Sequence, residues 1–370
     1  MGKKKKVEEP TEEEELELPE EENDEENNEE SEDENSDEEI EDTKELEELS
    51  KEEDVSKNDM DIADLPGVGE KTGQKLKAAG YVDMMALAAA SPLELAEAAA
   101  LGEATAAKII QGARSKLTLG YETAADVMER RKDIKKISTG SKELDDLLGG
   151  GVETQAVTEM HGAFGSGKSQ LGFQLAVNVQ KSVEEGGLGG GCLFIDTEDT
   201  FRPERIIQLA ESQGMDPQKV LENIVVARAY NSDHQTILAD RSPEIIKEKN
   251  IKLIVVDSLM AMFRSDFVGR GTLASRQQKL NRHLKKLKRL SDVYNVAVYV
   301  TNQVMSNPAI LFGDPTRPIG GHILGHFSTF RVYLRKSKGE NRIARMVDSP
   351  NLPEKDCLFR VCPEGVRDTE

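Results

Sequence analysis

One run of residues constrains this sequence more than any other feature: Gly162, Ala163, Phe164, Gly165, Ser166, Gly167, Lys168 and Ser169. The run matches the P-loop pattern, and it lies between an apolar, strand-like stretch and a helical stretch, as that motif requires. The glycines let backbone N–H groups face a β-phosphate, Lys168 neutralises β- and γ-phosphate oxygens, and the Ser169 hydroxyl ligates Mg²⁺. The sequence therefore predicts a site for a nucleoside triphosphate and magnesium.

The sequence around this motif alternates apolar runs with helical stretches. The runs lie at residues 156–160, 192–196, 224–227, 253–257 and 296–301. Such alternation predicts an α/β fold with a mostly parallel sheet. Later apolar runs, at residues 329–334, 343–347 and 358–361, are separated by turns and predict an antiparallel extension of that sheet. A glycine-rich stretch at residues 186–191 is interpreted as a flexible surface insertion.

The negative charge is concentrated at the start of the chain. Residues 1–58 hold 29 Asp/Glu and 7 Lys/Arg, which accounts for the whole net charge of -22. This tail has almost no aromatic or β-branched residues, so we expect it to be disordered. A solubilising role is the plain interpretation; the sharper hypothesis is that it competes with DNA for basic surfaces of the folded part.

Composition excludes several classes of protein. No apolar run approaches the roughly 20 residues that cross a bilayer, so we expect no membrane-spanning segment. The lysine-rich start leads into acidic residues, so we expect no secretory signal. Three cysteines, Cys192, Cys357 and Cys362, lack metal-site spacing and cannot all pair, which excludes a disulfide scaffold and fits a reducing cytoplasm.

Residues 59–116 are rich in Ala and Leu and predict a small helical domain, followed by a connector at residues 117–136. Within the helical domain, Gly67 and Gly69 form a predicted tight turn that leads into a helix at residues 72–79, with Lys71 nearby. The turn resembles a helix-hairpin-helix, whose backbone N–H groups bind DNA phosphate without reading sequence. The alternative is an ordinary helical turn.

Two acidic residues follow apolar runs and are candidates for catalysis. Asp257 ends one run, where a carboxylate orients magnesium in P-loop proteins, and Glu198 follows another, where it is our choice for the general base. A solvated loop acid is the alternative for Glu198. Residues 264–289 hold nine Lys/Arg against one acid, which predicts DNA phosphate binding. A merely solvated basic helix stays the alternative for residues 285–289. Within residues 264–289, Leu273, Leu280, Leu284 and Leu287 keep helical spacing and predict a core-facing side.

Several long motifs in order carry a family resemblance. They are Asp-Thr-Glu-Asp-Thr-Phe-Arg-Pro-Glu-Arg at residues 196–205, Thr-Asn-Gln at 301–303, Pro-Ile-Gly-Gly-His at 318–322 and Asp-Ser-Pro-Asn-Leu-Pro-Glu at 348–354. With the P-loop, they resemble the archaeal RadA proteins, which are RecA-like strand-exchange recombinases. The resemblance covers residues 59–368.

The resemblance implies that ATP lies between neighbouring protomers of a helical filament. Arg205 would stack on the adenine, Glu198 would activate water, and Gln303 would sense the γ-phosphate. A neighbour's turn would cap the nucleotide with Asp348 and Pro350. His326 resembles the histidine that reads the phosphate across the interface. A buried structural histidine is the alternative, and for His322 we prefer it.

The resemblance also assigns surfaces for DNA and for assembly. Arg264, Arg270 and Arg276 would belong to a first DNA-binding loop, and residues 304–319, with Phe312 and Arg317, to a second. Tyr121 and Ala124 match the motif that inserts into the adjacent ATPase domain, although most members carry Phe at the position of Tyr121, which puts the strength of that interface in doubt.

Together these features predict four parts: a disordered acidic tail (1–58), a helix-hairpin-helix domain (59–116), a linker with the polymerisation motif (117–136) and a RecA-like ATPase core (137–370). The predicted function is ATP-dependent DNA strand exchange by a filament on single-stranded DNA in recombinational repair, with double-stranded DNA, other copies of the chain and recombination mediators as partners. The alternatives are a RadB-like mediator and a RecA-like ring helicase.

Overall fold

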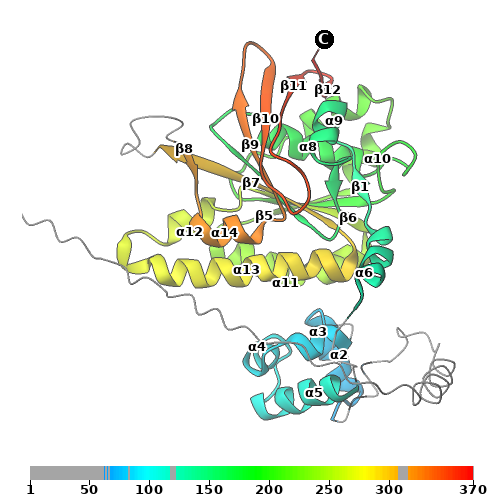
Figure 1. The fold of residues 1–370 in the computed structure, drawn as a ribbon, viewed down its shortest axis with the longest axis vertical. Helices are drawn as coiled ribbons and strands as arrows, with labels where there is room; N and C mark the ends of the chain where they lie inside the picture. The colour runs from blue at the N-terminus through cyan, green and yellow to red at the C-terminus, as the bar shows by residue number, and fades with distance from the viewer. Residues whose placement is uncertain are drawn as a thin grey trace, which may run out of the picture. The chain divides into compact units, whose positions relative to one another are not determined.

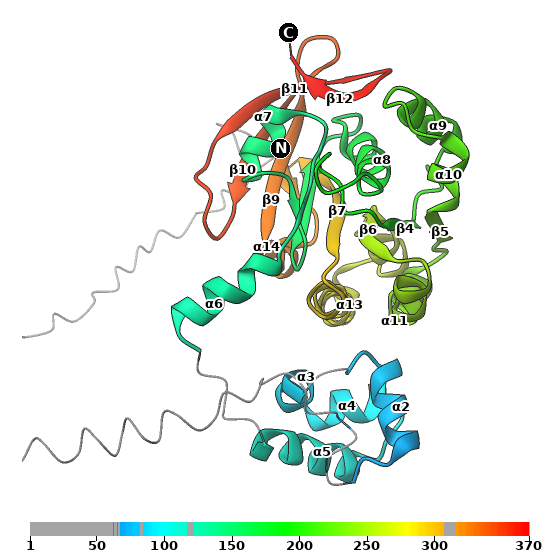
Figure 2. The ribbon, with the colours of Figure 1, turned by 90° about the vertical axis from the view of Figure 1, so that its right-hand side faces the viewer.

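The computed structural model describes residues 62, 65, 67–81, 84–116, 122–306 and 316–369, without the side chains of Met85, Arg270, Ser306 and His322. The predicted acidic tail, Tyr121 and Phe312 lie outside the described residues, as do the predicted roles of the Arg270 and His322 side chains. Figures 1 and 2 show the described elements from two directions.

The first part is a small bundle of helices: α2 (Glu70–Ala78), α3 (Met84–Ala89), α4 (Pro92–Ala98) and α5 (Glu103–Lys116). Its core holds Leu76, Leu87, Leu95 and Ile109, each no more than 1% exposed. The predicted helix at residues 72–79 instead spans Glu70–Ala78, because Gly69 is its N-cap and the helix starts directly after it. The turn before it contains Gly67 at φ +88°, a value that favours glycine.

A short connecting region precedes the main sheet. It comprises α6 (Ala124–Arg130), η2 (Arg131–Asp133), β1 (Lys136–Ile137), α7 (Lys142–Leu147) and β2 (Val152–Glu153). Helix α6 begins with a capping box, in which the side chains of Thr123 and Asp126 each bond the other's backbone N–H.

Strands of the main sheet run in the order β12-β11-β10-β9-β3-β7-β6-β4-β5, with β8 paired to β7. The pairs from β9 through β3 to β5 are parallel, and β10, β11 and β12 pair antiparallel, as the sequence predicts. The strands are β3 (Val157–Gly162), β4 (Gly191–Asp196), β5 (Ile224–Arg228), β6 (Ile251–Asp257), β7 (Ala297–Ser306), β8 (Thr316–Pro318), β9 (Phe330–Lys336), β10 (Asn341–Asp348), β11 (Asp356–Cys362) and β12 (Gly365–Asp368).

Helices cover both faces of this sheet (Figures 1 and 2). One face carries α8 (Lys168–Asn178), α9 (Pro203–Glu211) and α10 (Pro217–Glu222). The other carries α11 (Ser232–Glu248) and α13 (Leu273–Tyr294), with α12 (Ala261–Asp266), η3 (Arg270–Thr272) and α14 (Gly321–Phe327) nearby. The predicted α/β fold with a mostly parallel sheet is therefore confirmed.

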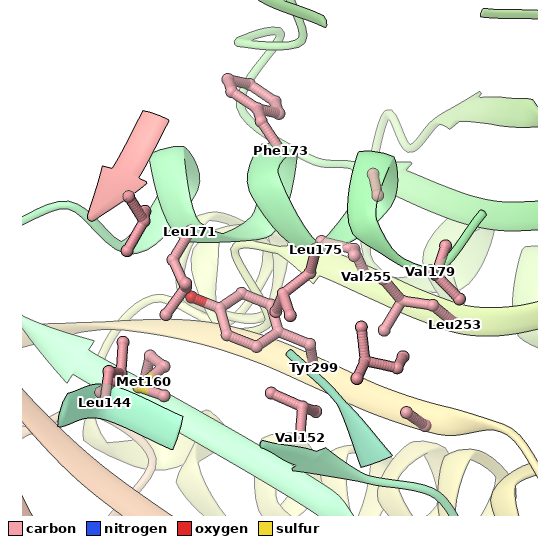
Figure 3. Close-up of a cluster of buried hydrophobic side chains, with 14 of the residues drawn as sticks. Leu144, Val152, Met160, Leu171, Phe173, Leu175, Val179, Leu253, Val255 and Tyr299 are labelled. Carbon is pink, nitrogen blue, oxygen red and sulfur yellow. The ribbon is translucent and has the colours of Figure 1, made fainter. Parts of the chain in front are cut away.

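Alternate residues of the central strands enter opposite layers of the core. Phe194 and Val255 pack toward α8, whereas Leu193 and Ile254 pack toward α11 and α13. Figure 3 shows the α8 side, where Leu171 and Leu175 lie above the strands. A strand that is covered on both faces is apolar throughout, which is why these strands are continuous apolar runs in the sequence.

Two local predictions are wrong. The glycines at residues 186–191 are not an open insertion, because a Cβ on Gly187 would lie 2.3 Å from the Lys181 carbonyl oxygen and one on Gly190 would lie 2.3 Å from Lys252 Cγ. Close packing of the backbone explains these glycines. Leu273 does not face the core but is 42% exposed, since it is the first residue of α13; Leu280, Leu284 and Leu287 are buried as predicted.

Candidate nucleotide site

The P-loop connects the carboxyl end of β3 to the first turn of α8. Gly165 and Gly167 adopt φ values of +71° and +106°, which side chains disfavour. At Gly162 a Cβ would lie 2.1 Å from the Leu334 carbonyl oxygen, so a side chain there would displace the neighbouring strand β9. The loop thus needs glycine for two reasons, backbone conformation and space, and it presents N–H groups at a helix N-terminus, where an anion binds.

Lys168 is buried beside the loop that precedes it. Its ammonium donates to the carbonyl oxygens of Gly162 at 2.8 Å and Ala163 at 3.0 Å. Burial lowers the pKa of Lys168, and the carboxylates of Asp257 and Glu198 oppose that shift. The hydroxyl of Tyr299, in β7, donates to the Lys168 carbonyl at 2.8 Å and so fixes the start of α8 on the sheet. Figure 3 shows the Tyr299 ring in the buried cluster beside Leu171 and Leu175.

Asp257 ends β6 and supplies a buried carboxylate next to the P-loop helix. Its Oδ1 accepts a hydrogen bond from Thr301. Burial raises the pKa of Asp257, while the hydroxyls of Thr301 and Ser169 lower it. Within the described part of the chain, the buried Oδ2 atom of Asp257 has no hydrogen-bond partner. A carboxylate oxygen left over beside a serine hydroxyl fits Mg²⁺, which prefers oxygen ligands.

Glu198 lies on the loop after β4, and Asp196 shapes that loop. The Asp196 carboxylate accepts from the backbone N–H groups of Glu198 at 3.0 Å, Thr200 at 3.2 Å and Phe201 at 2.9 Å. The Glu198 Oε1 atom then accepts from Gln303 Nε2 and from Ser258 Oγ, each at 2.8 Å. The structure therefore joins the predicted base and the predicted sensor directly. Sequence reasoning missed Asp196 as the loop organiser and Ser258 as a donor.

Gln303 and its neighbour Asn302 also hold the segment that returns at residue 319. The Ile319 backbone N–H donates to the Gln303 carbonyl at 3.0 Å, and Asn302 Nδ2 donates to the Ile319 carbonyl at 2.6 Å. Asn302 Nδ2 also donates to Glu159, which is buried and paired with Arg331 at 2.9 Å. A buried polar network thus anchors both ends of the predicted second DNA loop.

Arg205 is held at the edge of α9 by groups that are distant in sequence. Its guanidinium donates to Gln170 Oε1 at 2.8 Å and to the carbonyls of Pro363 at 2.6 Å and Cys362 at 2.8 Å. Gln170 belongs to α8, so the predicted adenine-stacking residue lies beside the P-loop helix.

A cavity of about 730 Å³ brings together three predicted residues, His326, Arg317 and Asp348. Pro350 does not line it, but His161 and Tyr333 do, and sequence reasoning gave those two no role. Their rings stack with centroids 5.5 Å apart. Burial lowers the pKa of His161 to about 4, so this ring is neutral at physiological pH. His326 is exposed, which does not fit a buried structural histidine.

The basic residues at positions 264–289, on the face of the sheet that α11 and α13 cover, divide into two groups. Arg264 is exposed and Arg276 is half-buried. Lys279 and Lys286 instead pair with Asp233 at 2.6 Å and Asp240 at 3.3 Å, both in α11, and Lys288 pairs with Asp292. Part of the positive charge of α13 therefore neutralises acids of the same face, which a count along the sequence could not show.

Two family models match the chain. Residues 130–369 match the Rad51 family, and residues 59–115 match the SAM-like helix-hairpin-helix tandem family. The chain belongs to the Rad51 family. It is therefore a RecA-like recombinase with an N-terminal helix-hairpin-helix region, and it belongs to a nucleotide-binding family.

Within the described part of this Rad51-family chain, no helix combines the length and apolar character that crossing a bilayer requires.

Proposed function

We propose that this chain is a recombinase of the archaeal RadA type, which hydrolyses ATP, forms helical filaments on single-stranded DNA and catalyses homologous pairing and strand exchange. The observation that carries the proposal is the 2.8 Å hydrogen bond between Gln303 and Glu198. Gln303 adjoins the predicted second DNA loop, and Glu198 is the predicted base, so DNA binding and hydrolysis share one contact. A protein that only bound nucleotide would not need that connection.

ATP and Mg²⁺ are the proposed nucleotide and metal. The backbone of residues 162–167 would hold the β-phosphate, and Lys168 would neutralise phosphate charge. Ser169 and Asp257 would hold magnesium, which stabilises the charge on the leaving diphosphate. Glu198 would take a proton from the attacking water, and Arg205 would pack on the base.

Filament assembly is supported by an unpaired sheet edge. On the side away from β4, none of the described strands pairs with β5. Val226, in β5, is 43% exposed. Tyr230 and Ile237, which follow β5 in the chain, are 68% and 46% exposed. An exposed edge with apolar side chains is a template for an added strand. The proposed occupant is the neighbour's segment around Tyr121 and Ala124; Ala124 is exposed at the start of α6.

In such a filament, His326, Asp348 and Pro350 would act on the neighbour's nucleotide. His326 and Asp348 are exposed and line one cavity, as two groups that reach a shared ligand would. This arrangement makes ATP part of the subunit interface, so binding favours assembly and hydrolysis favours release.

Two surfaces are proposed to bind DNA. In the helical domain, Gly67, Gly69 and Lys71 are exposed, and a Cβ on either glycine would meet no described atom within 4 Å, so a phosphate could approach the backbone closely. In the core, Arg264, Arg276 and Arg317 would contact phosphates without reading base sequence. Arg270 and Phe312 remain part of this proposal on the resemblance alone.

The test is D-loop formation with a matched single-stranded oligonucleotide and a supercoiled duplex. We expect D-loops with ATP and magnesium, and loss of D-loops in the Lys168→Ala protein. Duplex unwinding without pairing would instead indicate a ring helicase. ATP binding without pairing, together with stimulation of a separate recombinase, would indicate a RadB-like mediator.

A further inference from the structure

Ser258 contacts the predicted general base from a buried position. It follows Asp257 at the end of β6, and its hydroxyl donates to Glu198 Oε1 at 2.8 Å. Ser258 is 3% exposed, whereas Glu198 is exposed on the loop after β4. A buried residue at the end of β6 therefore donates a hydrogen bond to a carboxylate on an exposed loop.

Thr197 fixes the position of Ser258. The Thr197 Oγ1 atom accepts from the Ser258 backbone N–H and donates to the Ser258 carbonyl, both at 2.8 Å. The Thr197 backbone N–H also donates to the Asp257 carbonyl at 2.9 Å. Both residues are buried, and each backbone polar group of Ser258 has a partner. Ser258 can therefore move little relative to Glu198.

Gln303 is the other donor to the same oxygen, and it differs from Ser258 in exposure. Gln303 is exposed, so no described neighbour encloses its side chain, whereas Ser258 is buried. If Gln303 leaves, Ser258 still holds Oε1. Because both donors act on Oε1, the proton taken from water would be accepted on Oε2.

We propose that Ser258 is the permanent positioning residue for the general base Glu198, while Gln303 is the exchangeable one. The inference rests on the proposed ATPase function. In the reaction, the water oxygen bonds to the γ-phosphorus, the bond from that phosphorus to the bridging oxygen breaks, and ADP leaves with the electron pair. The water proton passes to Glu198 Oε2 and then to solvent. Ser258 exchanges no proton with substrate; it keeps the carboxylate aligned with the water.

The test compares single-turnover and steady-state ATP hydrolysis of Ser258→Ala with wild type on single-stranded DNA. We expect kcat to fall about 10-fold, a part of the roughly 100-fold or greater effect of a general base. The dissociation constant for a fluorescent ATP analogue should stay within about twofold, since Ser258 acts after binding. Ser242→Ala is the matched control, because Ser242 is also buried (2% exposed) and its hydroxyl bonds Ala239 within its own helix.

A double-mutant comparison separates positioning from a general structural role. In a Glu198→Gln background, Ser258→Ala should change kcat by less than about twofold, because the group that it positions is no longer a base. Ser258→Cys, which keeps the side-chain size but donates weakly, should reproduce the loss if the alanine protein is unstable.

Unchanged kcat in a folded Ser258→Ala or Ser258→Cys protein would overturn the inference, as would a full 10-fold loss in the Glu198→Gln background. In either case wild-type hydrolysis and strand exchange would still support the proposed function. Wild-type protein that binds ATP but never hydrolyses it would overturn the proposed ATPase and this inference with it.

Discussion

The side-chain amide of Gln303 donates to Oε1 of Glu198 over 2.8 Å, although the two residues are separated by 105 positions in sequence. Gln303 lies in β7 and Glu198 follows β4, and the carboxyl ends of these parallel strands meet at one edge of the sheet. The Gln303 carbonyl also accepts from Ile319, where the chain returns. Gln303 therefore contacts both Ile319 and the predicted base Glu198.

Replacing Gln303 by Ala should uncouple hydrolysis from DNA. Glu198 would keep Ser258 as a donor, so we expect slow basal hydrolysis to persist while stimulation by single-stranded DNA falls about 10-fold or more. Phosphate release with and without oligonucleotide measures this. Gln213→Ala is the control, since the side-chain amide of Gln213 donates to the Leu209 carbonyl at 3.1 Å, just after α9 and within its own turn of chain. Full stimulation in the Gln303→Ala protein would contradict the coupling.

Replacing Val226 by Asp should block self-assembly. A charge on the β5 edge would be buried by an added strand, so filaments should disappear while the protein still binds ATP. Electron microscopy and size-exclusion chromatography with ATP and DNA would show the difference. Leu358→Asp is the matched control, because Leu358 is similarly exposed, at 46%, on β11, which already has strands on both sides. Normal filaments from the Val226→Asp protein would rule out this edge.

His283 should make stability depend on pH. It belongs to α13, is fully buried and contacts Gln235 of α11, and burial lowers its pKa from 6.5 to about 4. The unfolded chain therefore binds a proton at a pH where the folded chain does not. The stabilisation is complete above pH 6.5 and is lost as the pH falls toward 4, by on the order of 2 kcal/mol at pH 5.

Urea unfolding at pH 8 and pH 5 tests this dependence on His283. His283→Gln should lower stability at pH 8, because packing with Phe263 is lost. Between pH 8 and pH 5, however, the variant should lose less stability than wild type. Equal losses in the two proteins would show that His283 is not responsible.

Replacing Arg331 by Met should destabilise the sheet. Glu159 has no exposed side-chain surface, and Arg331 is its cationic partner at 2.9 Å. An uncompensated buried carboxylate costs about 3 kcal/mol or more. Adding Glu159→Gln should recover part of the loss, because the second change removes the buried charge. Urea midpoints of the single and double variants report this, and a single variant as stable as wild type would show that the pair contributes little.

The sequence predicts much of the fold because the strands and the P-loop carry local signals. Apolar runs bounded by turns located the central strands, and the later runs located β9, β10 and β11. The errors arise where contacts with residues distant in sequence decide whether a residue is buried. The glycines at 187 and 190 resemble a flexible stretch, but the backbone around them leaves no room for side chains. Leu273 keeps helical spacing with buried leucines, yet it lies at the helix start and stays exposed.

The sequence alone determined the phosphate-binding loop, the carboxylates at strand ends and the positions of the strands along the chain, because glycine conformation and apolar periodicity act over a few residues. Tertiary structure decided which distant groups meet. Ser258 and Gln303 converge on one oxygen of Glu198, and carbonyls near the C-terminus hold Arg205. Such contacts depend on how strands are ordered within a sheet, and no local pattern specifies the partner of a side chain that lies on a different strand.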